Sequence, residues 1–234
     1  MSEFRLRWHV YSNLDQLIET VANGIVSEAA RAISAAGRFF VVLAGGSTPR
    51  PIYMRLVELN TSWHQWHIYF GDERCLRAGH PERNDSMIRE VWLDKVAIPV
   101  DQIHAVPAEL GPDAGAISYA QELAGLGPFD LTLLGLGEDG HTASLFPGGP
   151  LGCQRGAPDV LAVHTAPKLP ASRVSMSAAR LTRSQSVQLI VTGEEKRATL
   201  TRLRDGADMP IRSVTPANGI DLFLDRSALP TAVV

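Results

Sequence analysis

Five consecutive apolar residues at 39–43 (FFVVL) constrain the fold of this chain more than any other feature. An uninterrupted apolar run of this length is typical of a strand that is covered on both faces, as in a parallel sheet. Residues 12–36 precede the run and repeat apolar side chains with a period of about 3.6 residues, which predicts an amphipathic helix. Residues 49–59 follow it and predict a second helix, with Pro49 near its first turn. A helix, a buried strand and a helix in this order are typical of α/β proteins.

The same alternation of strands and helices continues to residue 224. Further strands are predicted at residues 66–70, 130–134, 173–177, 187–192 and 220–224, and further helices at 84–95, 114–123 and 194–204. We interpret the Pro/Gly-rich stretches at 147–158 and 167–170 as loops rather than as an interdomain linker. The chain is therefore predicted to be one domain, residues 1–234, of fold class α/β: a doubly wound, mainly parallel sheet with helices on both faces, a Rossmann-like three-layer sandwich.

The composition restricts the partners that such a domain could have. A formal net charge of -3 argues against nucleic-acid binding by bulk electrostatics, so any anion must be held by local groups. No apolar run reaches the roughly 18 residues of a membrane span, and the first residues contain no apolar signal segment. Cys75 and Cys153 form no CxxC pair, which favours a reducing compartment. We expect a cytoplasmic protein, either a monomer or a small homo-oligomer.

The first candidate site follows the apolar run directly and consists of Gly45, Gly46, Ser47 and Thr48. Glycines allow a backbone to approach a ligand closely, and the predicted helix that begins next offers unpaired N–H groups. With two added hydroxyl groups, this turn is suited to a phosphate. An ordinary strand-to-helix turn is the alternative, and the local sequence does not decide between the two. The pattern GxxxxGK[ST] of a P-loop is absent.

The second candidate site is the charged run Asp72, Glu73 and Arg74, which follows the predicted strand at 66–70. Three consecutive charged residues at the end of a strand are commonly a solvated loop, and this interpretation remains open. The carboxyl ends of parallel strands are, however, where α/β proteins bind ligands. Arg74 could supply the bidentate anion contact that a slightly acidic protein otherwise lacks.

Gly135, Gly137 and Gly140 follow the predicted strand at 130–134 in the spacing GxGxxG, which suggests a dinucleotide site. That site requires a long helix directly after the third glycine. The sequence PGGP at 147–150 would stop any such helix after two turns at most. We therefore reject the dinucleotide interpretation and expect the glycines to bring the next residue close to a small substrate.

That next residue is His141, which lies in the turn beside Glu138 and Asp139. In the absence of neighbours an imidazole titrates at about pH 6.5, which suits a general base at neutral pH. No GxSxG elbow supports a serine nucleophile, so the sequence favours water activated by His141. No metal is expected, because His64 and His67 lack an acid or cysteine placed to complete a zinc site.

Taken together, these segments resemble the 6-phosphogluconolactonase family, within the superfamily that includes glucosamine-6-phosphate deaminases. The matching segments, in the family's order, are LAGGSTP (43–49), WHIYFGDERCL (66–76), RNDSMIRE (83–90), FDLTLLGLGEDGHTASLFPG (129–148), SRVSMSA (172–178) and TGEEK (192–196). The segment GEDGHTASLFP is the most specific of them. Many relatives have Ser where this chain has Ala44, and Ser-Asn where it has Arg83-Asn84, which leaves the role of Asn84 open.

The resemblance implies a carboxylic ester hydrolase that needs no metal or organic cofactor. Its substrate would be a small sugar-phosphate lactone, 6-phospho-D-glucono-1,5-lactone, hydrolysed to 6-phosphogluconate in the pentose phosphate pathway. It implies that His141 is the catalytic histidine and Asp72 an active-site acid, while Asp139 is a further candidate to assist His141. The phosphate-binding residues that it implies are Gly45, Gly46, Ser47, Thr48, Arg74, Arg173 and Lys196.

Two other functions remain as alternatives. Glucosamine-6-phosphate deaminases resemble one another in carrying a glutamate five residues after the histidine, where this chain has Phe146. A non-catalytic sugar-phosphate sensor would be expected to bring a DNA-binding helical module, whereas the N-terminus here predicts one long amphipathic helix and no basic segment. Ammonia release and ligand binding without turnover would identify these two cases.

Overall fold

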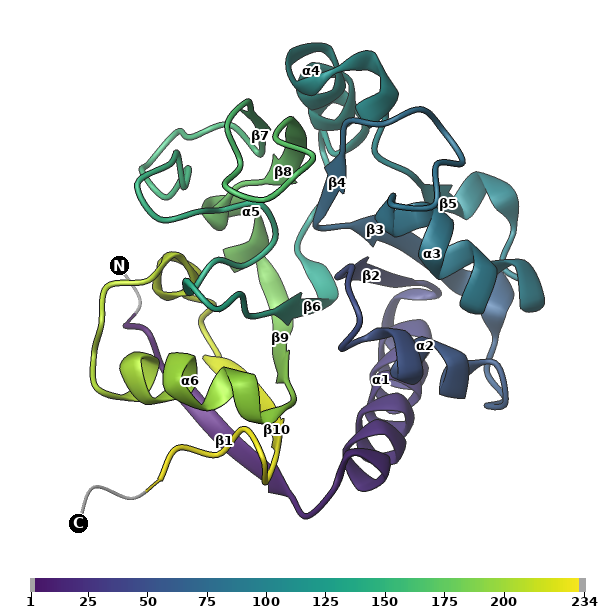
Figure 1. Cartoon of the computed structure of the whole chain (residues 1–234). Coiled ribbons are helices and arrows are strands. Elements are labelled where there is room, and N and C mark those ends of the chain that lie inside the picture. The colour runs from purple at the N-terminus through teal and green to yellow at the C-terminus, as the bar shows by residue number, and fades with distance from the viewer. Residues whose placement is uncertain (1–2, 232–234) are drawn as a thin grey trace.

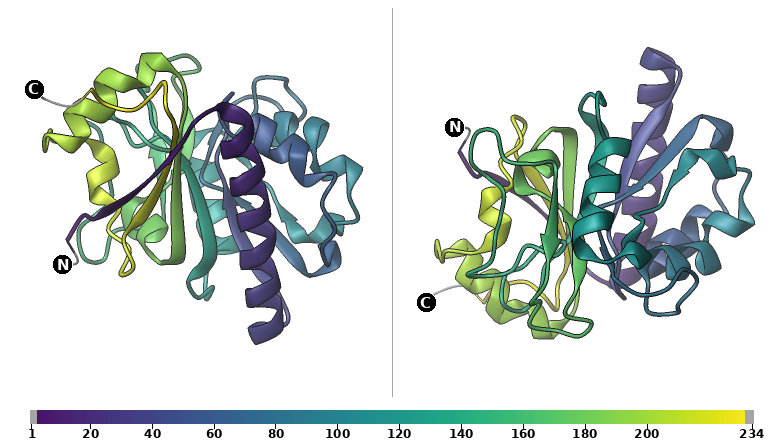
Figure 2. Two further views of the ribbon diagram at one scale, coloured as in Figure 1. Left: turned by 90° about the horizontal axis from the view of Figure 1, so that it is seen from below. Right: turned by 90° about the horizontal axis from the view of Figure 1, so that it is seen from above.

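A seven-stranded sheet forms the centre of the computed structural model, which describes residues 3–231 (Figures 1 and 2). Its strands are β1 (Leu6–Tyr11), β2 (Phe39–Leu43), β3 (Trp66–Phe70), β5 (Ile103–His104), β6 (Phe129–Gly135), β9 (Ser184–Val191) and β10 (Ile220–Asp225). They lie in the order β1-β10-β9-β6-β2-β3-β5, and every neighbouring pair is parallel. The prediction of an α/β fold with a mainly parallel sheet is confirmed.

A second sheet of three strands was not predicted. It consists of β4 (Asp72–Arg74), β8 (Arg173–Met176) and β7 (Val160–Val163), which pair in antiparallel fashion. The predicted strand at 173–177 therefore belongs to this small sheet and not to the parallel one. Gly71 joins the two sheets, because its N–H donates to the Leu43 carbonyl at 3.0 Å and its carbonyl accepts from the Met176 N–H at 2.8 Å.

Helices cover the parallel sheet and support its edges. The α-helices are α1 (Leu14–Ala36), α2 (Arg50–Leu56), α3 (Asn84–Val91), α4 (Pro112–Glu122), α5 (Ala178–Thr182) and α6 (Arg197–Arg204). Short 3-10 helices occur at η1 (Trp63–Gln65), η2 (Leu93–Lys95), η3 (Val100–Gln102), η4 (Ala108–Leu110), η5 (Glu194–Lys196) and η6 (Pro210–Ser213). The first helix begins after Asn13, whose side chain accepts a hydrogen bond from the Gln16 N–H, and it ends at Gly37 in the left-handed region.

Several boundaries differ from the prediction. The N-terminus does not consist of one helix alone, because β1 precedes α1 and pairs with β10. The predicted helix at 194–204 begins as the 3-10 turn η5, and the predicted helix at 84–95 stops at Val91 before η2. Neither β7 nor α5 was predicted. No helix within residues 3–231 is long and apolar enough to cross a membrane.

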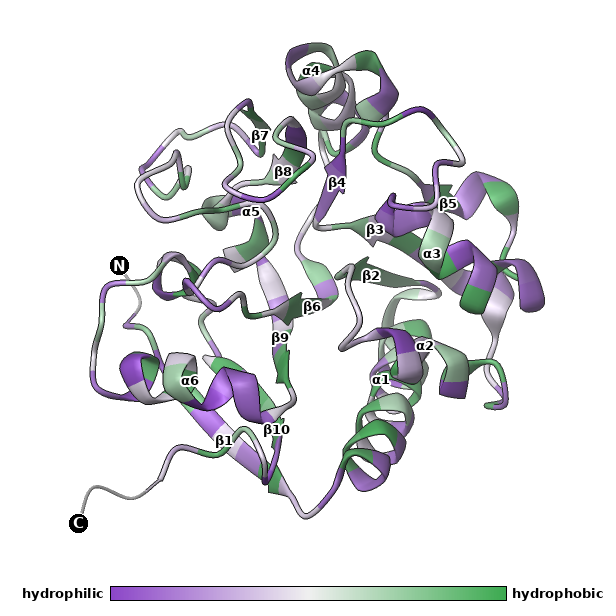
Figure 3. Ribbon diagram, in the orientation of Figure 1, coloured by the Kyte–Doolittle hydropathy of each residue, from purple (hydrophilic) through white to green (hydrophobic). Residues whose placement is uncertain are grey.

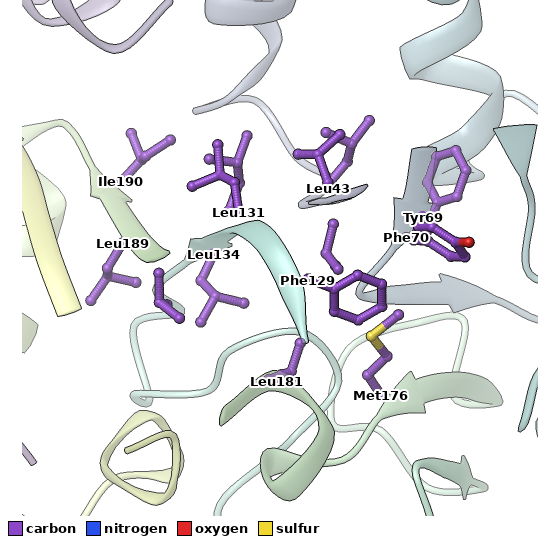
Figure 4. Packing of buried hydrophobic residues seen from close by; sticks show 14 of the residues in the cluster. Leu43, Tyr69, Phe70, Phe129, Leu131, Leu134, Met176, Leu181, Leu189 and Ile190 are labelled. Carbon is purple, nitrogen blue, oxygen red and sulfur yellow. The ribbon is translucent and has the colours of Figure 1, made fainter. Parts of the chain in front are cut away.

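The core lies on both faces of the parallel sheet, in which β2 is hydrophobic along its length (Figure 3). Figure 4 shows Leu131 and Ile190 on one face, and Leu134 and Leu189 on the other, where side chains from β8 and α5 meet them. The predicted continuous burial of residues 39–43 is confirmed, since four of the five residues are buried and Phe40 is partly buried. Burial on both faces holds the strand ends rigidly at the edge where the candidate site lies.

Candidate active site

A pocket of about 440 Å³ opens at the carboxyl ends of β2 and β6. These neighbouring strands lie where the chain order reverses, since β2 leads outward to β3 and β5 while β6 leads to β9 and β10. This position is the usual ligand site of open α/β sheets. The pocket is lined by nine of the ten residues named from the sequence: Gly45, Gly46, Ser47, Thr48, Asp72, Arg74, His141, Arg173 and Lys196. The tenth, Asp139, lies behind His141.

Asp139 contacts the imidazole of His141, with 2.5 Å between Asp139 Oδ1 and His141 Nδ1. The same oxygen accepts the His141 backbone N–H at 3.1 Å. Burial of Asp139 opposes its ionisation, but the hydrogen bonds from His141 outweigh burial and leave the pKa of Asp139 below its usual value. An ionised Asp139 accepts a hydrogen bond from Nδ1–H, so in the neutral imidazole the lone pair is at Nε2. His141 is thereby prepared to act as a base.

Gly137 gives the imidazole its place. A Cβ at this position would lie 2.0 Å from His141 Nδ1, so no other residue fits without moving the ring. The Gly137 N–H also donates to the His141 carbonyl at 2.8 Å, which closes the turn. No helix follows Gly140 in residues 141–159, as the rejection of a dinucleotide site requires. Of the three glycines, Gly137 makes room for the imidazole, and the approach of His141 to a substrate stays a prediction.

Phe146 packs beside the imidazole, with 4.7 Å between the two ring centroids. Its side chain is buried, and it lines the pocket. An apolar ring therefore occupies the position for which the sequence comparison expects a glutamate in deaminases. A second proton carrier is absent from this position.

Asp72 forms no hydrogen bond or ion pair with His141, whose carboxylate partner is Asp139. Its carboxylate accepts from Ser144 Oγ at 2.5 Å and from Asn84 Nδ2 at 3.3 Å, and Asn84 Nδ2 also donates to the Asp72 carbonyl at 2.9 Å. These bonds assign Asn84 the role of fixing Asp72 at the pocket wall. Glu138 lines the pocket, but the structure gives its carboxylate no bond to His141. Of the three acids considered, Asp139 is the one that contacts the imidazole.

Arg74 and Arg173 are cross-strand partners on β4 and β8. Arg74 donates to the Glu82 carbonyl, while its buried Nε has no partner among residues 3–231. Arg173 Nε donates to the Pro170 carbonyl at 2.9 Å, and Nη2 donates to the Lys168 carbonyl at 3.1 Å. Burial lowers the pKa of Arg173 from its ordinary value. Two guanidinium groups thus meet at one wall of the pocket.

Glu73 links β4 to the start of α3 beneath this wall of the pocket, a role that the sequence did not indicate. Its fully buried carboxylate accepts the backbone N–H groups of Arg74 at 2.7 Å, Asn84 at 2.8 Å and Asp85 at 2.9 Å. Buried Arg83 lies beside it and donates to the Asp85 carboxylate through two nitrogens at 2.9 Å. The charged run after β3 is therefore a buried network and not a solvated loop. Burial also raises the pKa of the neighbouring Cys75 thiol to about 11, so this thiol stays neutral.

The glycine turn at 45–48 lies against the same network. A Cβ on Gly45 would be 1.8 Å from Asn84 Oδ1, so this position requires glycine for close packing. The turn leads into α2, whose first turn has no side-chain cap to occupy its N–H groups. Binding of a phosphate by this turn stays a prediction.

The pocket also contains residues that sequence reasoning missed. Lys168 and Leu169 reach it from the loop between β7 and β8, and Glu195 lines it beside Lys196. Nothing in the Pro-containing sequence around Lys168 indicates this position, because the loop is placed by Arg173. Within residues 3–231, no group of three or more His, Cys, Asp or Glu side chains is arranged to hold a metal ion.

Fold and pocket together define an α/β protein with a pocket at the carboxyl ends of its central strands, lined by Arg74, Arg173 and Lys196. Residues 12–223 match the family model described as glucosamine-6-phosphate isomerases/6-phosphogluconolactonase. The chain belongs to this family. The predicted resemblance is therefore confirmed at the level of the family.

Individual relatives agree with this assignment. A 6-phosphogluconolactonase of Synechocystis sp. is 34% identical over 232 residues, which cover 94% of this chain and 95% of the relative. The crystal structure of 6-phosphogluconolactonase from Thermotoga maritima aligns with a TM-score of 0.86 at 26% identity, over 95% of this chain and 100% of that one. The 6-phosphogluconolactonase from Trypanosoma brucei aligns with a TM-score of 0.83 at 27% identity, over 97% and 98% of the two chains.

Proposed function

We propose that this chain is a 6-phosphogluconolactonase, which hydrolyses 6-phospho-D-glucono-1,5-lactone to 6-phosphogluconate in the pentose phosphate pathway. The observation that carries the proposal is the His141–Asp139 pair at 2.5 Å, in a pocket that also contains Arg74, Arg173 and Lys196. The names of the relatives, which match nearly the full chain, support the same activity. The reaction needs a base, a bound phosphate and water, and the pocket offers groups for each.

The phosphate is held by the turn at 45–48 together with Arg74, Arg173 and Lys196. Glycine N–H groups, hydroxyls and three cations are the donors that a phosphate dianion prefers. This binding energy, remote from the reacting bond, orients the sugar ring so that C1 lies beside His141.

His141 Nε2 removes a proton from a water molecule as the water oxygen attacks C1. Asp139 holds the other ring nitrogen and stabilises the imidazolium that forms. The tetrahedral oxyanion accepts hydrogen bonds from Arg74 or from backbone N–H groups of the glycine turns. When the bond from C1 to the ring oxygen breaks, His141 returns its proton to that oxygen, which becomes a free hydroxyl. The carboxylic acid formed at C1 then loses its proton to solvent, and 6-phosphogluconate leaves as the carboxylate. Asp72, fixed by Asn84 and Ser144, orients the water or a substrate hydroxyl.

The deaminase alternative loses support at Phe146. Ring-opening isomerisation uses a second proton carrier near the histidine, and the buried Phe146 ring fills that place. An ammonia-release assay with glucosamine 6-phosphate should therefore show no turnover.

The test of the proposed function separates chemistry from binding. His141→Ala should lower kcat by roughly 10²- to 10⁴-fold, because the general base is lost. Lys196→Ala should mainly raise KM for the lactone, because it removes a phosphate contact. Both are measured by lactone hydrolysis, with circular dichroism as the control for folding. A folded His141→Ala protein with near-normal kcat would contradict the assignment.

The remaining expectations stay part of this proposal. We place the reaction in the cytoplasm, since both cysteines are free thiols. Residues 1–234 act as one domain, an expectation supported by the pairing of β1 with β10 in one sheet. The protein is a monomer or a small homo-oligomer without a nucleic-acid or membrane partner.

A further inference from the structure

We propose that Lys168 binds an anionic oxygen of the substrate, and that Arg173 positions it by holding the loop between β7 and β8. The inference rests on the proposed lactonase function and adds a substrate-binding residue to it. Lys168 lines the same pocket as Lys196. Lys168 lies outside all the sequence segments that carry the family resemblance.

Arg173 fixes the main chain at Lys168 and at the two residues that follow it. Its Nε donates to the Pro170 carbonyl at 2.9 Å, and its Nη2 donates to the carbonyls of Lys168 at 3.1 Å and Leu169 at 3.4 Å. Arg173 is only 6% exposed, so these bonds are shielded from water. The loop is closed further by the Ala166 N–H, which donates to the Ala171 carbonyl at 2.9 Å. The loop therefore has a defined position, while Arg173 Nη1 remains available for the phosphate.

The same loop is packed against the catalytic turn. Ala166 forms a small buried cluster with Phe146 and Val163. Phe146 in turn lies against the His141 imidazole, with 4.7 Å between ring centroids. A chain of contacts thus links His141 to the loop that carries Lys168. In this position Lys168 can bind an anionic oxygen of one of two groups. One group is the phosphate, and the other is C1, whose oxygen becomes negative during the reaction.

The ammonium group of Lys168 is free to bind such an oxygen. It makes no ion pair and no hydrogen bond with any residue in the described range 3–231, and the same is true of Lys196. The chain contains three lysines, and these two line one pocket of a protein whose formal net charge is -3. The Lys168 ammonium is compact, carries three donors and sits on a flexible side chain. It can therefore adjust to the negative charge that develops on the substrate more easily than the Arg173 guanidinium, which carbonyl groups hold in place.

Lysine acetylation tests the contact directly, with Lys95 as an internal reference. Lys95 is exposed on η2 and does not line the pocket. Saturating 6-phosphogluconate should slow acetylation of Lys168 and Lys196 at least about tenfold, by mass spectrometry, and leave Lys95 unchanged. Protection of Lys168 by inorganic phosphate assigns the contact to the phosphate, and protection by gluconate assigns it to the C1 carboxylate. Protection of Lys196 without Lys168 would overturn this inference alone, whereas protection of neither would contradict the proposed function.

Kinetics give a second readout. Lys168→Gln should lower kcat/KM roughly 10- to 100-fold, the usual effect of losing one charge-assisted hydrogen bond, while Lys95→Gln stays within about twofold of wild type. An effect on KM alone indicates contact with the phosphate, and an effect on kcat indicates contact at C1. Lys168→Gln within twofold of wild type would overturn the proposal.

A double-mutant cycle tests the positioning role of Arg173. If Arg173 acts through the loop, Lys168→Gln should cost less than about threefold in an Arg173→Gln background, because Lys168 is already misplaced there. Acetylation of Lys168 in Arg173→Gln should also lose its protection by 6-phosphogluconate. Strictly multiplicative effects of the two substitutions, with protection retained, would show that Arg173 does not position Lys168.

Discussion

At the scale of single residues, the pair of Asp139 and His141 decides how the pocket can react. Asp139 determines which ring nitrogen carries the proton, and Gly137 leaves room for the ring in that position. The position and tautomer of the imidazole are therefore defined by three residues within one turn.

Asp139→Asn should lower kcat on the order of 100-fold with a small change in KM, because the amide no longer enforces the tautomer that leaves Nε2 free. The matched control is Asp113→Asn, which removes the carboxylate from the exposed Asp113–His164 pair outside the pocket. Steady-state lactone hydrolysis measures both. Equal kcat for Asp139→Asn and wild type would show that His141 does not depend on this carboxylate.

Asp139 should also contribute to stability in a pH-dependent way. Its pKa is lowered in the folded protein, so the contribution is present above the unfolded value, about 3.9, and is lost as the pH falls through the folded value. Wild type should thus lose its advantage over Asp139→Asn in urea unfolding as the pH falls below about 4. The difference will be small, because the Asp139 side chain is 36% exposed. An advantage that grew with falling pH would reverse the inferred sign.

At the scale of elements, burial that shows in the local sequence was predictable and burial that depends on distant partners was not. The bounds predicted for β2 and β3 are those observed, because their apolar runs are covered on both faces. In β1, polar Arg7 and His9 alternate with apolar residues, and both bind Asp221 of β10, which the local pattern does not reveal. The charged strand β4 was hidden for the same reason, since Glu73 is satisfied by the start of α3.

The candidate site follows the same rule. Residues directly after buried strands or in the glycine turns were predicted to share one edge, and His141, Arg74 and Lys196 do line one pocket. Lys168 was missed because its loop is placed by Arg173 and not by a strand. The sequence also could not select Asp139 among three acids, since Asp72, Glu138 and Asp139 all lie in turns that follow buried strands. The hydrogen bond from His141 to Asp139 identifies it.

The junction between the glycine turn and α3 can be tested with two matched glycine substitutions. Gly45→Ala should destabilise the protein by about 1–3 kcal/mol and lower kcat/KM, because the new Cβ displaces Asn84 from Asp72. Gly24→Ala, inside α1 with nothing within 4 Å of its Cβ, should stabilise it by about 0.5–1 kcal/mol. Urea unfolding measures both. A Gly45→Ala protein as stable as wild type would mean that the turn and Asn84 are not packed as described.

At the scale of the whole molecule, the pocket is shared by the two sheets: the parallel sheet supplies His141 and the turn at 45–48, and the small sheet supplies Arg74 and Arg173. A ligand that bridges them should stabilise the entire fold. At 100 times its Kd, 6-phosphogluconate should add about 2.7 kcal/mol, which is roughly 5–10 °C in Tm. Gluconate, which lacks the phosphate, is the control and should give a much smaller shift in differential scanning fluorimetry. Equal Tm shifts with the two ligands would show that the phosphate group does not contribute to binding.

The pairing of β1 with β10 has a consequence for synthesis (Figures 1 and 2). In the parallel sheet β1 lies at the edge, and β10 is its one neighbour there. Since β1 is synthesised long before β10, it must wait for residues 220–225 before it can pair. Until those residues have been made, the apolar side chains of β1 lack their neighbour and remain open to chaperones or to wrong partners. The synthesis of β10 is therefore the step that allows this edge of the sheet to form.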